Sequence, residues 1–196
     1  AAGTSITSGA TLNINGVAIG AEAMTVNGTG VGGNGALTGT GTSSLSGLIT
    51  LGSSSTINST SGTFTISNAG TITGSGFDLT IGGAGDGSLA SIIGTGAGTV
   101  TKNGTGTWTL SGANTYTGTT TVGVGTLVAA NANALGTTAS GTSITSGATL
   151  NINGAAVGAE AVTVNGTGVG GNGALTGTGT SSLAGLITLG STSVIN

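Results

Sequence analysis

The sequence predicts an all-β fold, a parallel β-solenoid of roughly eight coils with no long helices. Three observations point to it: a composition dominated by strand and turn residues, strict alternation of threonine with apolar residues, and a long internal repeat. Together they indicate that residues 1–196 form one continuous solenoid segment.

The composition excludes several classes of protein. The chain has 44 glycines, no proline, no cysteine, no histidine, one basic and four acidic residues. Long helices are disfavoured because Gly, Thr, Ser and Asn replace the good helix formers, and glycine without a triplet period or proline does not fit collagen. A net charge of −3 gives no basic surface for nucleic acid. No apolar run is long enough for a membrane-spanning helix, so none is expected.

Alternation is clearest over residues 107–128, TWTLSGANTYTGTTTVGVGTLV. Successive side chains of an extended strand point to opposite sides, so Trp108, Leu110, Tyr116 and Val122 are predicted to be buried and the threonines to face outward. Strands are expected around Trp108 and Val122, and also at 115–117, with glycines at the turns between them.

A family resemblance covers residues 101–136, TKNGTGTWTLSGANTYTGTTTVGVGTLVAANANALG. This stretch resembles the strand repeat of autotransporter passengers, in its Lys-x-Gly-x-Gly-Thr start, its Thr-Leu-Ser-Gly-x-Asn-Thr-Tyr-Thr-Gly centre and its Gly-Thr-Leu close. The resemblance implies a right-handed, single-stranded parallel β-helix, carried on a bacterial surface or secreted. It also implies that the chain is an interior piece of a passenger.

The chain repeats itself at long range. Residues 3–58 recur as residues 141–196, an offset of 141 − 3 = 138, and we interpret residues 1–138 as one unit and 139–196 as the start of the next. The two copies differ only at six positions: Val17/Ala155, Ile19/Val157, Met24/Val162, Ser46/Ala184, Ser54/Thr192 and Thr56/Val194. Strand-like triplets within the unit suggest coils of roughly 23 residues, about six coils per unit, and a rise on the order of 29 Å per unit. We expect a segment of a longer tandem array.

Asn-Gly pairs mark the expected turns. They begin at residues 15, 27, 34, 103, 153, 165 and 172. Glycine after asparagine adopts the left-handed conformation at little cost, which suits tight corners. Isolated Asn-Gly pairs are typical of β-hairpins, so an antiparallel sandwich is the alternative fold.

Residues for catalysis, cofactors or metals are scarce. Asp78 and Asp86 are the candidates for a glycosidase-like carboxylate pair, and we interpret them as a solvated turn acid and an exposed strand-edge acid. Residues 28–33 have the glycine spacing of a dinucleotide fingerprint, but no helix is predicted after them. Residues 82–87 resemble a calcium nonapeptide with Asp86 one place too early. We therefore expect no enzyme, no catalytic residue, no cofactor and no metal site.

Surface binding is a second hypothesis. Thr-x-Thr triplets resemble those of ice-binding β-helices, although their intervals are uneven; they start at residues 63, 71, 99, 107 and 115. Glycosylation sequons begin at Asn27, Asn58, Asn103 and Asn165. Four aromatic residues could stack on sugars if exposed, but their alternation with threonine favours the core; they are Phe64, Phe77, Trp108 and Tyr116.

The sequence thus favours a structural role. We expect an extracellular or cell-surface stalk or fibre of an adhesin-like bacterial protein, whose partners are neighbouring copies of the same repeat or chain and surface glycans. A glycan- or ice-binding module is the alternative. With so few titrating groups, the shape is expected to change little with pH.

Overall fold

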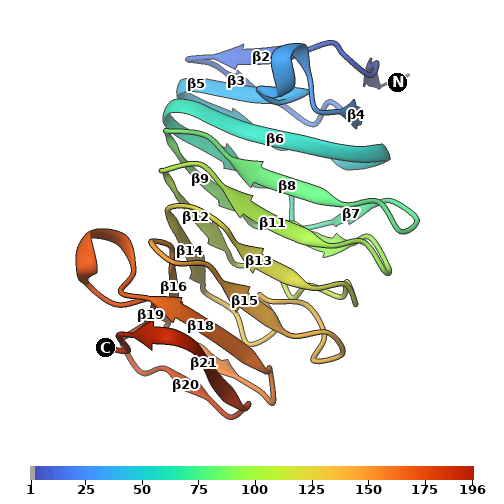
Figure 1. Cartoon of the computed structure of the whole chain (residues 1–196). Helices are drawn as coiled ribbons and strands as arrows, with labels where there is room; N and C mark the ends of the chain where they lie inside the picture. The colour runs from blue at the N-terminus through green and yellow to red at the C-terminus, as the bar shows by residue number, and fades with distance from the viewer. Residues whose placement is uncertain (1–2) are drawn as a thin grey trace.

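The computed structural model describes residues 3–196, which form a parallel β-solenoid with its ends at opposite poles (Figure 1). Every strand pairing found in these residues is parallel, and the helical elements are two single 3-10 turns, η1 (Val31–Gly33) and η2 (Val169–Gly171). The predicted fold class is confirmed, and the antiparallel sandwich is excluded.

Each coil has three faces, which we number in the order in which the chain passes through them. Face 1 contains β1 (Thr4–Ile6), β4 (Met24–Gly28), the start of β6 (Ile49–Ile66), β7 (Thr71–Thr73), β10 (Ile92–Gly94), β17 (Ala156–Val157) and β20 (Ser182–Leu183). Face 2 contains β2 (Leu12–Asn15), the first half of β5 (Leu37–Leu45), the middle of β6, β8 (Leu79–Gly82), β11 (Val100–Asn103), β13 (Thr120–Val122), β15 (Thr142–Ile144), β18 (Val162–Gly166) and β21 (Ile187–Ser193). Face 3 contains β3 (Ala18–Ile19), the ends of β5 and β6, β9 (Asp86–Leu89), β12 (Thr107–Leu110), β14 (Thr126–Ala129), β16 (Thr149–Asn153) and β19 (Leu175–Thr178).

Face 2 carries an unbroken ladder through the whole segment. Its inward-pointing members are Leu12, Leu37, Ile57, Ile81, Lys102, Val122, Ile144, Val164 and Leu189. These nine rungs mark about eight complete turns, as predicted. Coil length varies, because the step from Thr4 to its partner Met24 is shorter than the step from Met24 to its partner Ile49.

The core runs along the axis and is filled by the inward side chains. Trp108, Tyr116 and Phe64 are fully buried, which confirms the prediction from alternation. Phe77 differs, because it lies in the loop before β8 and is only partly buried against the core. The stretch 115–117 is not a strand, contrary to expectation, although the amide of Thr115 still donates to the carbonyl of Ile93 in the coil before.

The Asn-Gly corners adopt the conformation that the sequence predicts. All seven glycines that follow an asparagine have positive φ: Gly16, Gly28, Gly35, Gly104, Gly154, Gly166 and Gly173. An L-residue with a Cβ resists this conformation, so glycine fixes where the chain turns from one face to the next.

The repeat does not contain a whole number of coils. Ile6 lies on face 1 of the first coil and pairs with Val26, whereas its counterpart Ile144 is the seventh rung of the face 2 ladder and pairs with Val122. The 138-residue unit therefore spans six coils and one further face, and the expected six coils per unit was short by a third of a turn. The expected number was wrong because it assumed an average coil of about 23 residues. The actual coils differ in length, and the differences add up to a shift of one face over the unit.

Glycine also makes room for the largest core side chain. Gly87 pairs with Trp108 on the next coil, and a Cβ at Gly87 would overlap the indole ring. We expect Gly87→Ala to lower the free energy of unfolding by about 1–3 kcal/mol through overpacking. Gly20→Ala is the matched control, because a Cβ at Gly20 meets nothing and its φ is not left-handed. Urea unfolding followed by tryptophan fluorescence measures both, and equal stability of the two variants would contradict this packing.

Candidate functional site

Several buried polar side chains of residues 100–129 bind backbone groups within their own coil and in neighbouring coils. Lys102 is one of them, and it occupies an inward position of β11 between Ile81 and Val122. Its side chain is fully buried, and Nζ donates to the carbonyls of Gly104 at 2.7 Å and Val124 at 2.9 Å. Burial lowers the pKa of Lys102 to about 8, and the charge of Asp86 opposes this shift.

Trp108 joins two coils through its indole nitrogen. Nε1 donates to the carbonyl of Gly82 at 2.9 Å, and the bond is buried. On face 3 the residue lies between Gly87 of the preceding coil and Leu127 of the following one. The ring therefore fills the core and also satisfies a backbone oxygen at the corner between β8 and β9.

Asn114 bridges three consecutive coils. Its Oδ1 accepts from the amide of Ile93 at 2.8 Å, and its Nδ2 donates to the carbonyl of Ala134 at 2.6 Å. The side chain is almost completely buried. Between Leu110 and Thr120 the chain forms no strand, so backbone groups there lack their usual partners in the sheet. The Asn114 side chain supplies hydrogen bonds in their place.

Tyr116 and Thr120 form a short buried chain of hydroxyl groups. The Tyr116 hydroxyl lies 2.6 Å from Oγ1 of Thr120, which donates onward to the carbonyl of Leu135 at 3.2 Å. Because Thr120 gives its proton to Leu135, the tyrosine is the donor of the first bond. Burial raises the pKa of the Tyr116 hydroxyl above its ordinary value.

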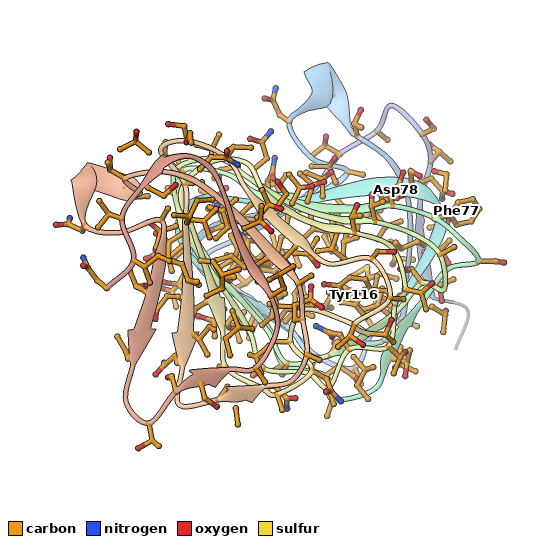
Figure 2. The ribbon with its side chains drawn as sticks, turned by 60° about the horizontal axis from the view of Figure 1, so that its bottom comes forward. Phe77, Asp78 and Tyr116 are labelled. Carbon is orange, nitrogen blue, oxygen red and sulfur yellow. The ribbon has the colours of Figure 1, made fainter. Side chains whose placement is uncertain are left out.

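The two candidate carboxylates lie at the starts of strands on different faces and bond the next coil. Asp78 precedes β8 on face 2, and its Oδ1 accepts from the amide and hydroxyl of Thr99 at 2.8 and 2.9 Å. These bonds hold the pKa of Asp78 below its ordinary value. Asp86 begins β9 on face 3 and accepts from the amide of Thr107 at 2.7 Å. Figure 2 shows Asp78 and Phe77 at the outside of the solenoid and Tyr116 within it.

The glycine-rich motifs have structures unlike the sites they resemble. Residues 28–33 lead from β4 into η1, a single 3-10 turn that Gly32 interrupts, where a dinucleotide fingerprint requires a longer helix. Residues 82–87 form the corner between β8 and β9, and Gly83 stacks closely on the backbone of Ser59. Within residues 3–196 no group of three or more potential metal-ligating side chains occurs, and no helix is both long and apolar enough to cross a membrane.

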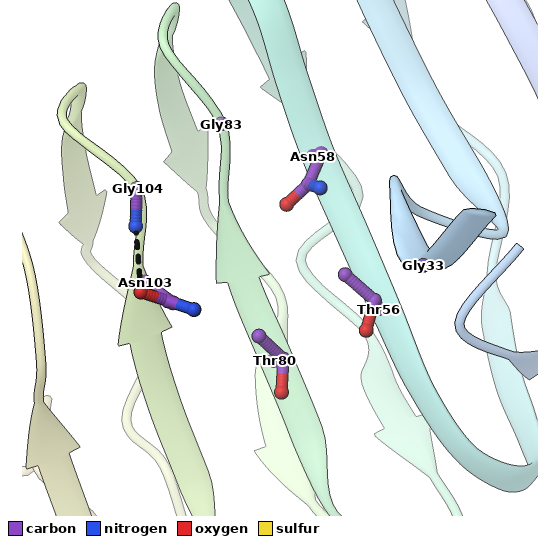
Figure 3. A pocket seen from close by; sticks show the side chains of 7 residues that line it. All are labelled: Gly33, Thr56, Asn58, Thr80, Gly83, Asn103 and Gly104. Atoms are coloured by element: carbon purple, nitrogen blue, oxygen red, sulfur yellow. Dashed lines mark hydrogen bonds between the residues drawn. The ribbon is translucent and has the colours of Figure 1, made fainter.

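A surface depression near η1 is shallow and is lined by uncharged residues. It has a volume of about 390 Å³ and lies between the η1 loop and the corners of β6, β8 and β11 (Figure 3). Its polar lining consists of Thr56, Thr80, Asn58 and Asn103. Asn58 donates through Nδ2 to the carbonyl of Asn34 at 2.8 Å, whereas Asn103 is exposed.

Two other asparagines of the glycosylation sequons also use their side-chain amides within the fold. Asn27 and Asn165 donate through Nδ2 to the backbone carbonyls of Ile6 and Ile144 respectively, both at 2.9 Å.

Outward hydroxyl groups form one long column on face 2, which we call the hydroxyl column. It consists of Thr56, Thr80, Thr101, Thr121, Ser143, Thr163 and Thr188, each paired with the next. The Thr-x-Thr triplets, in contrast, alternate between faces, and no two of them lie on the same face of adjacent coils. The regular array comes from single threonines that the triplet pattern did not reveal.

The fold and the buried polar groups define a β-solenoid repeat protein. Comparison with known proteins makes the class more specific: residues 100–129 match the family model of the passenger-associated transport repeat. This stretch runs from β11 to β14, and the match confirms the resemblance to the autotransporter-passenger repeat that the sequence shows. No curated protein and no solved structure gives a significant match to the chain.

Sequence reasoning missed Lys102 and Asn114 as core residues. The signal for Lys102 was its position two residues after Val100. Side chains two residues apart in a strand point to the same side, so Lys102 points inward with Val100. Asn114 gave no such signal, because its burial depends on the irregular corner between coils.

The buried amine and phenol make stability depend on pH above neutrality. Unfolded lysine titrates at 10.5 and the folded pKa of Lys102 is about 8, so the unfolded chain binds more protons between these values. The free energy of unfolding should therefore rise from pH 8, by at most about 1.4 kcal/mol per pH unit. Above pH 10 it should fall, because burial raises the pKa of Tyr116 and the unfolded phenol ionises first. Urea titrations across this range measure the curve.

Lys102→Met is the control for this profile. It should abolish the rise between pH 8 and 10 and leave the fall above pH 10. The same rise in both proteins would contradict the burial of the amine.

A matched pair of glutamates tests burial of a carboxylate. Glu160 accepts from Thr142 at 2.7 Å and is 2 % exposed, whereas Glu22, its repeat counterpart, accepts from Thr4 at 2.8 Å and is half-buried. Burial raises the pKa of Glu160 above 4.5, so its charge destabilises the fold as pH rises above that value. We expect Glu160→Gln to raise the melting temperature at pH 7 but not at pH 3, and Glu22→Gln, at the less buried counterpart, to have a smaller effect at pH 7. Equal effects of the two variants would contradict the expectation.

Proposed function

We propose that this chain is a structural, non-catalytic shaft segment of an exported bacterial surface protein, which acts as the stalk of an adhesin-like molecule. The observation that carries the proposal is the unbroken face 2 ladder, in which every coil is hydrogen-bonded along its backbone to the next. Such a body extends by adding coils and resists bending. The passenger-associated transport repeat supports the assignment to an exported passenger.

The outside of the shaft suits an exposed environment. The sequence has one lysine as its single basic residue, and this lysine is buried, so proteases that cut after basic residues find no accessible site. The surface is nearly uncharged, so repulsion between neighbouring shafts is weak, and we include side-by-side assembly of copies into filaments in the proposal.

The proposed shaft can be tested by measuring whether the molecule becomes longer as 138-residue units are added. Small-angle scattering of this chain should give a rod, and each added 138-residue unit should lengthen it by about 30 Å at about 4.8 Å per coil. Constant length with growing width would overturn the proposal. Labelling of intact producing cells with an antibody against the segment tests surface location, and concentration-dependent sedimentation tests lateral assembly.

A glycan- or ice-binding module is the second candidate, and the hydroxyl column favours it. The column holds seven hydroxyl side chains in register at about 4.8 Å, and all of them except the buried Thr56 present a regular, uncharged surface. Binding should appear in ice-recrystallisation or glycan-array assays and disappear in a Thr101→Glu/Thr121→Glu variant that keeps its circular dichroism spectrum. No binding by the unmodified chain removes this candidate.

A further inference from the structure

The two copies of the repeat occupy different faces of the same solenoid. In the first copy β1 lies on face 1 and β2 on face 2, whereas their counterparts β15 and β16 lie on faces 2 and 3. Counterpart β17 returns to face 1, where the first copy has β3 on face 3. Every strand of the second copy is displaced by one face in the same direction.

Local geometry is nevertheless the same in both copies. Thr4 pairs with Met24, and their counterparts Thr142 and Val162 pair with each other in the same register. The displaced strands also keep the irregular step between Val26 and Gly28, which recurs between Val164 and Gly166. The sequence therefore adopts one coil structure at two angular positions.

The clearest marker of the displacement is the loop after β4 and β18, which we call the valine loop (residues 28–35 and 166–173). Threonine of the preceding coil holds each loop: the Thr11 hydroxyl donates to Gly35 at 2.8 Å and accepts from Val31 at 2.9 Å. Thr149 makes the equivalent bonds at the same two distances. The tips carry exposed valines, Val31 at 63 % and Val169 at 40 %.

The two valine loops project from different corners. The first connects faces 1 and 2, and the second connects faces 2 and 3. Figure 1 shows η1 near the upper pole and η2 at the left below it, and Figure 2, from another direction, again separates them around the axis.

We infer that the 138-residue repeat is a unit of six and one-third turns, which rotates each successive copy by one face around the axis. Three successive units then complete a whole number of turns and restore the original orientation. This consequence rests on the proposed shaft: along it, the valine loops of successive units project from each of the three corners in turn. Two shafts of this chain lying side by side then present a valine loop to each other only at every third unit.

Disulfide cross-linking in this cysteine-free chain tests the displacement. Thr121 and Ser143 are direct partners on adjacent coils of face 2 and point outward. Thr121→Cys/Ser143→Cys should therefore oxidise to an intramolecular disulfide. In a six-turn unit Ser143 would lie on face 1 instead, above residues 115–117. Thr115→Cys/Ser143→Cys is the matched pair, and the first pair should react on the order of tenfold faster or more, because a disulfide needs Cα atoms about 4.4–6.8 Å apart.

Mass spectrometry after thiol alkylation reads out the cross-link, and circular dichroism confirms that both variants are folded. Preferential oxidation of the 115–143 pair, or no preference in folded protein, overturns the inference. The test does not depend on the shaft: rapid cross-linking of 121–143 in a chain whose length does not grow with added units would remove the proposed function and leave the displacement standing.

Discussion

Replacing Trp108 with alanine is expected to lower the free energy of unfolding by about 3–5 kcal/mol, as for other large buried aromatics. The indole is completely buried, fills the core opposite Gly87, and gives its only N–H to the carbonyl of Gly82. Alanine leaves a cavity and an unpaired corner carbonyl. Urea unfolding followed by far-ultraviolet circular dichroism measures the loss, since the variant lacks the fluorophore.

Trp108→Phe separates the two contributions. Phenylalanine keeps much of the apolar volume but cannot donate to Gly82, so its loss should be smaller than that of alanine. A Trp108→Ala variant within about 1 kcal/mol of the unmodified chain would contradict the packing of the Trp108 ring between β9 and β14.

Leu51→Ala is expected to cost about 2–5 kcal/mol, while the same substitution at its repeat counterpart Leu189 should cost well under about 1 kcal/mol. Both leucines follow Ile-Thr in the same local sequence. Leu51 is 1 % exposed because the coil of β7 and β8 covers it, whereas Leu189 lies on the last coil and is 59 % exposed. The difference isolates the stabilisation that a following coil provides.

Parallel urea titrations of the two alanine variants measure this difference. A third protein, lengthened by residues 59–89 after Asn196, adds a covering coil, and in it Leu189→Ala should become nearly as costly as Leu51→Ala. Equal small losses at both positions in the unmodified chain would contradict burial by stacking.

Much of the fold could be predicted from local chemistry. Alternation of Thr107, Trp108, Thr109 and Leu110 places side chains inside or outside a coil whatever lies above it, so burial followed directly from the pattern. Asn-Gly corners were predictable for the same reason, because left-handed φ is a property of the residue pair. Parallel stacking then follows from repetition, since similar coils present matching edges.

The angular position of each copy and the buried polar residues depend on longer-range register. Coil length changes without a local signal, as the unequal steps from Thr4 to Met24 and from Met24 to Ile49 show, so the one-face displacement emerges only after several uneven coils. Asn114 is buried because its two partners, Ile93 and Ala134, belong to other coils.

The two candidate carboxylates show the same division between local and long-range information. The turn and strand-edge positions of Asp78 and Asp86 followed from the sequence around them. Their bonds to Thr99 and Thr107 did not, because these depend on the register of the next coil.

Because this surface carries few charges, the segment should respond little to the concentration of dissolved salt. Mobile ions act on proteins mainly by screening fixed charges, over a Debye length of about 8 Å at physiological concentration and about 30 Å in dilute solution. Here the single cation is enclosed, and Asp78 and Asp86 are already tied to amides. Cohesion between coils rests on amide bonding and apolar packing, so the segment should keep the same dimensions from dilute solution to concentrated salt.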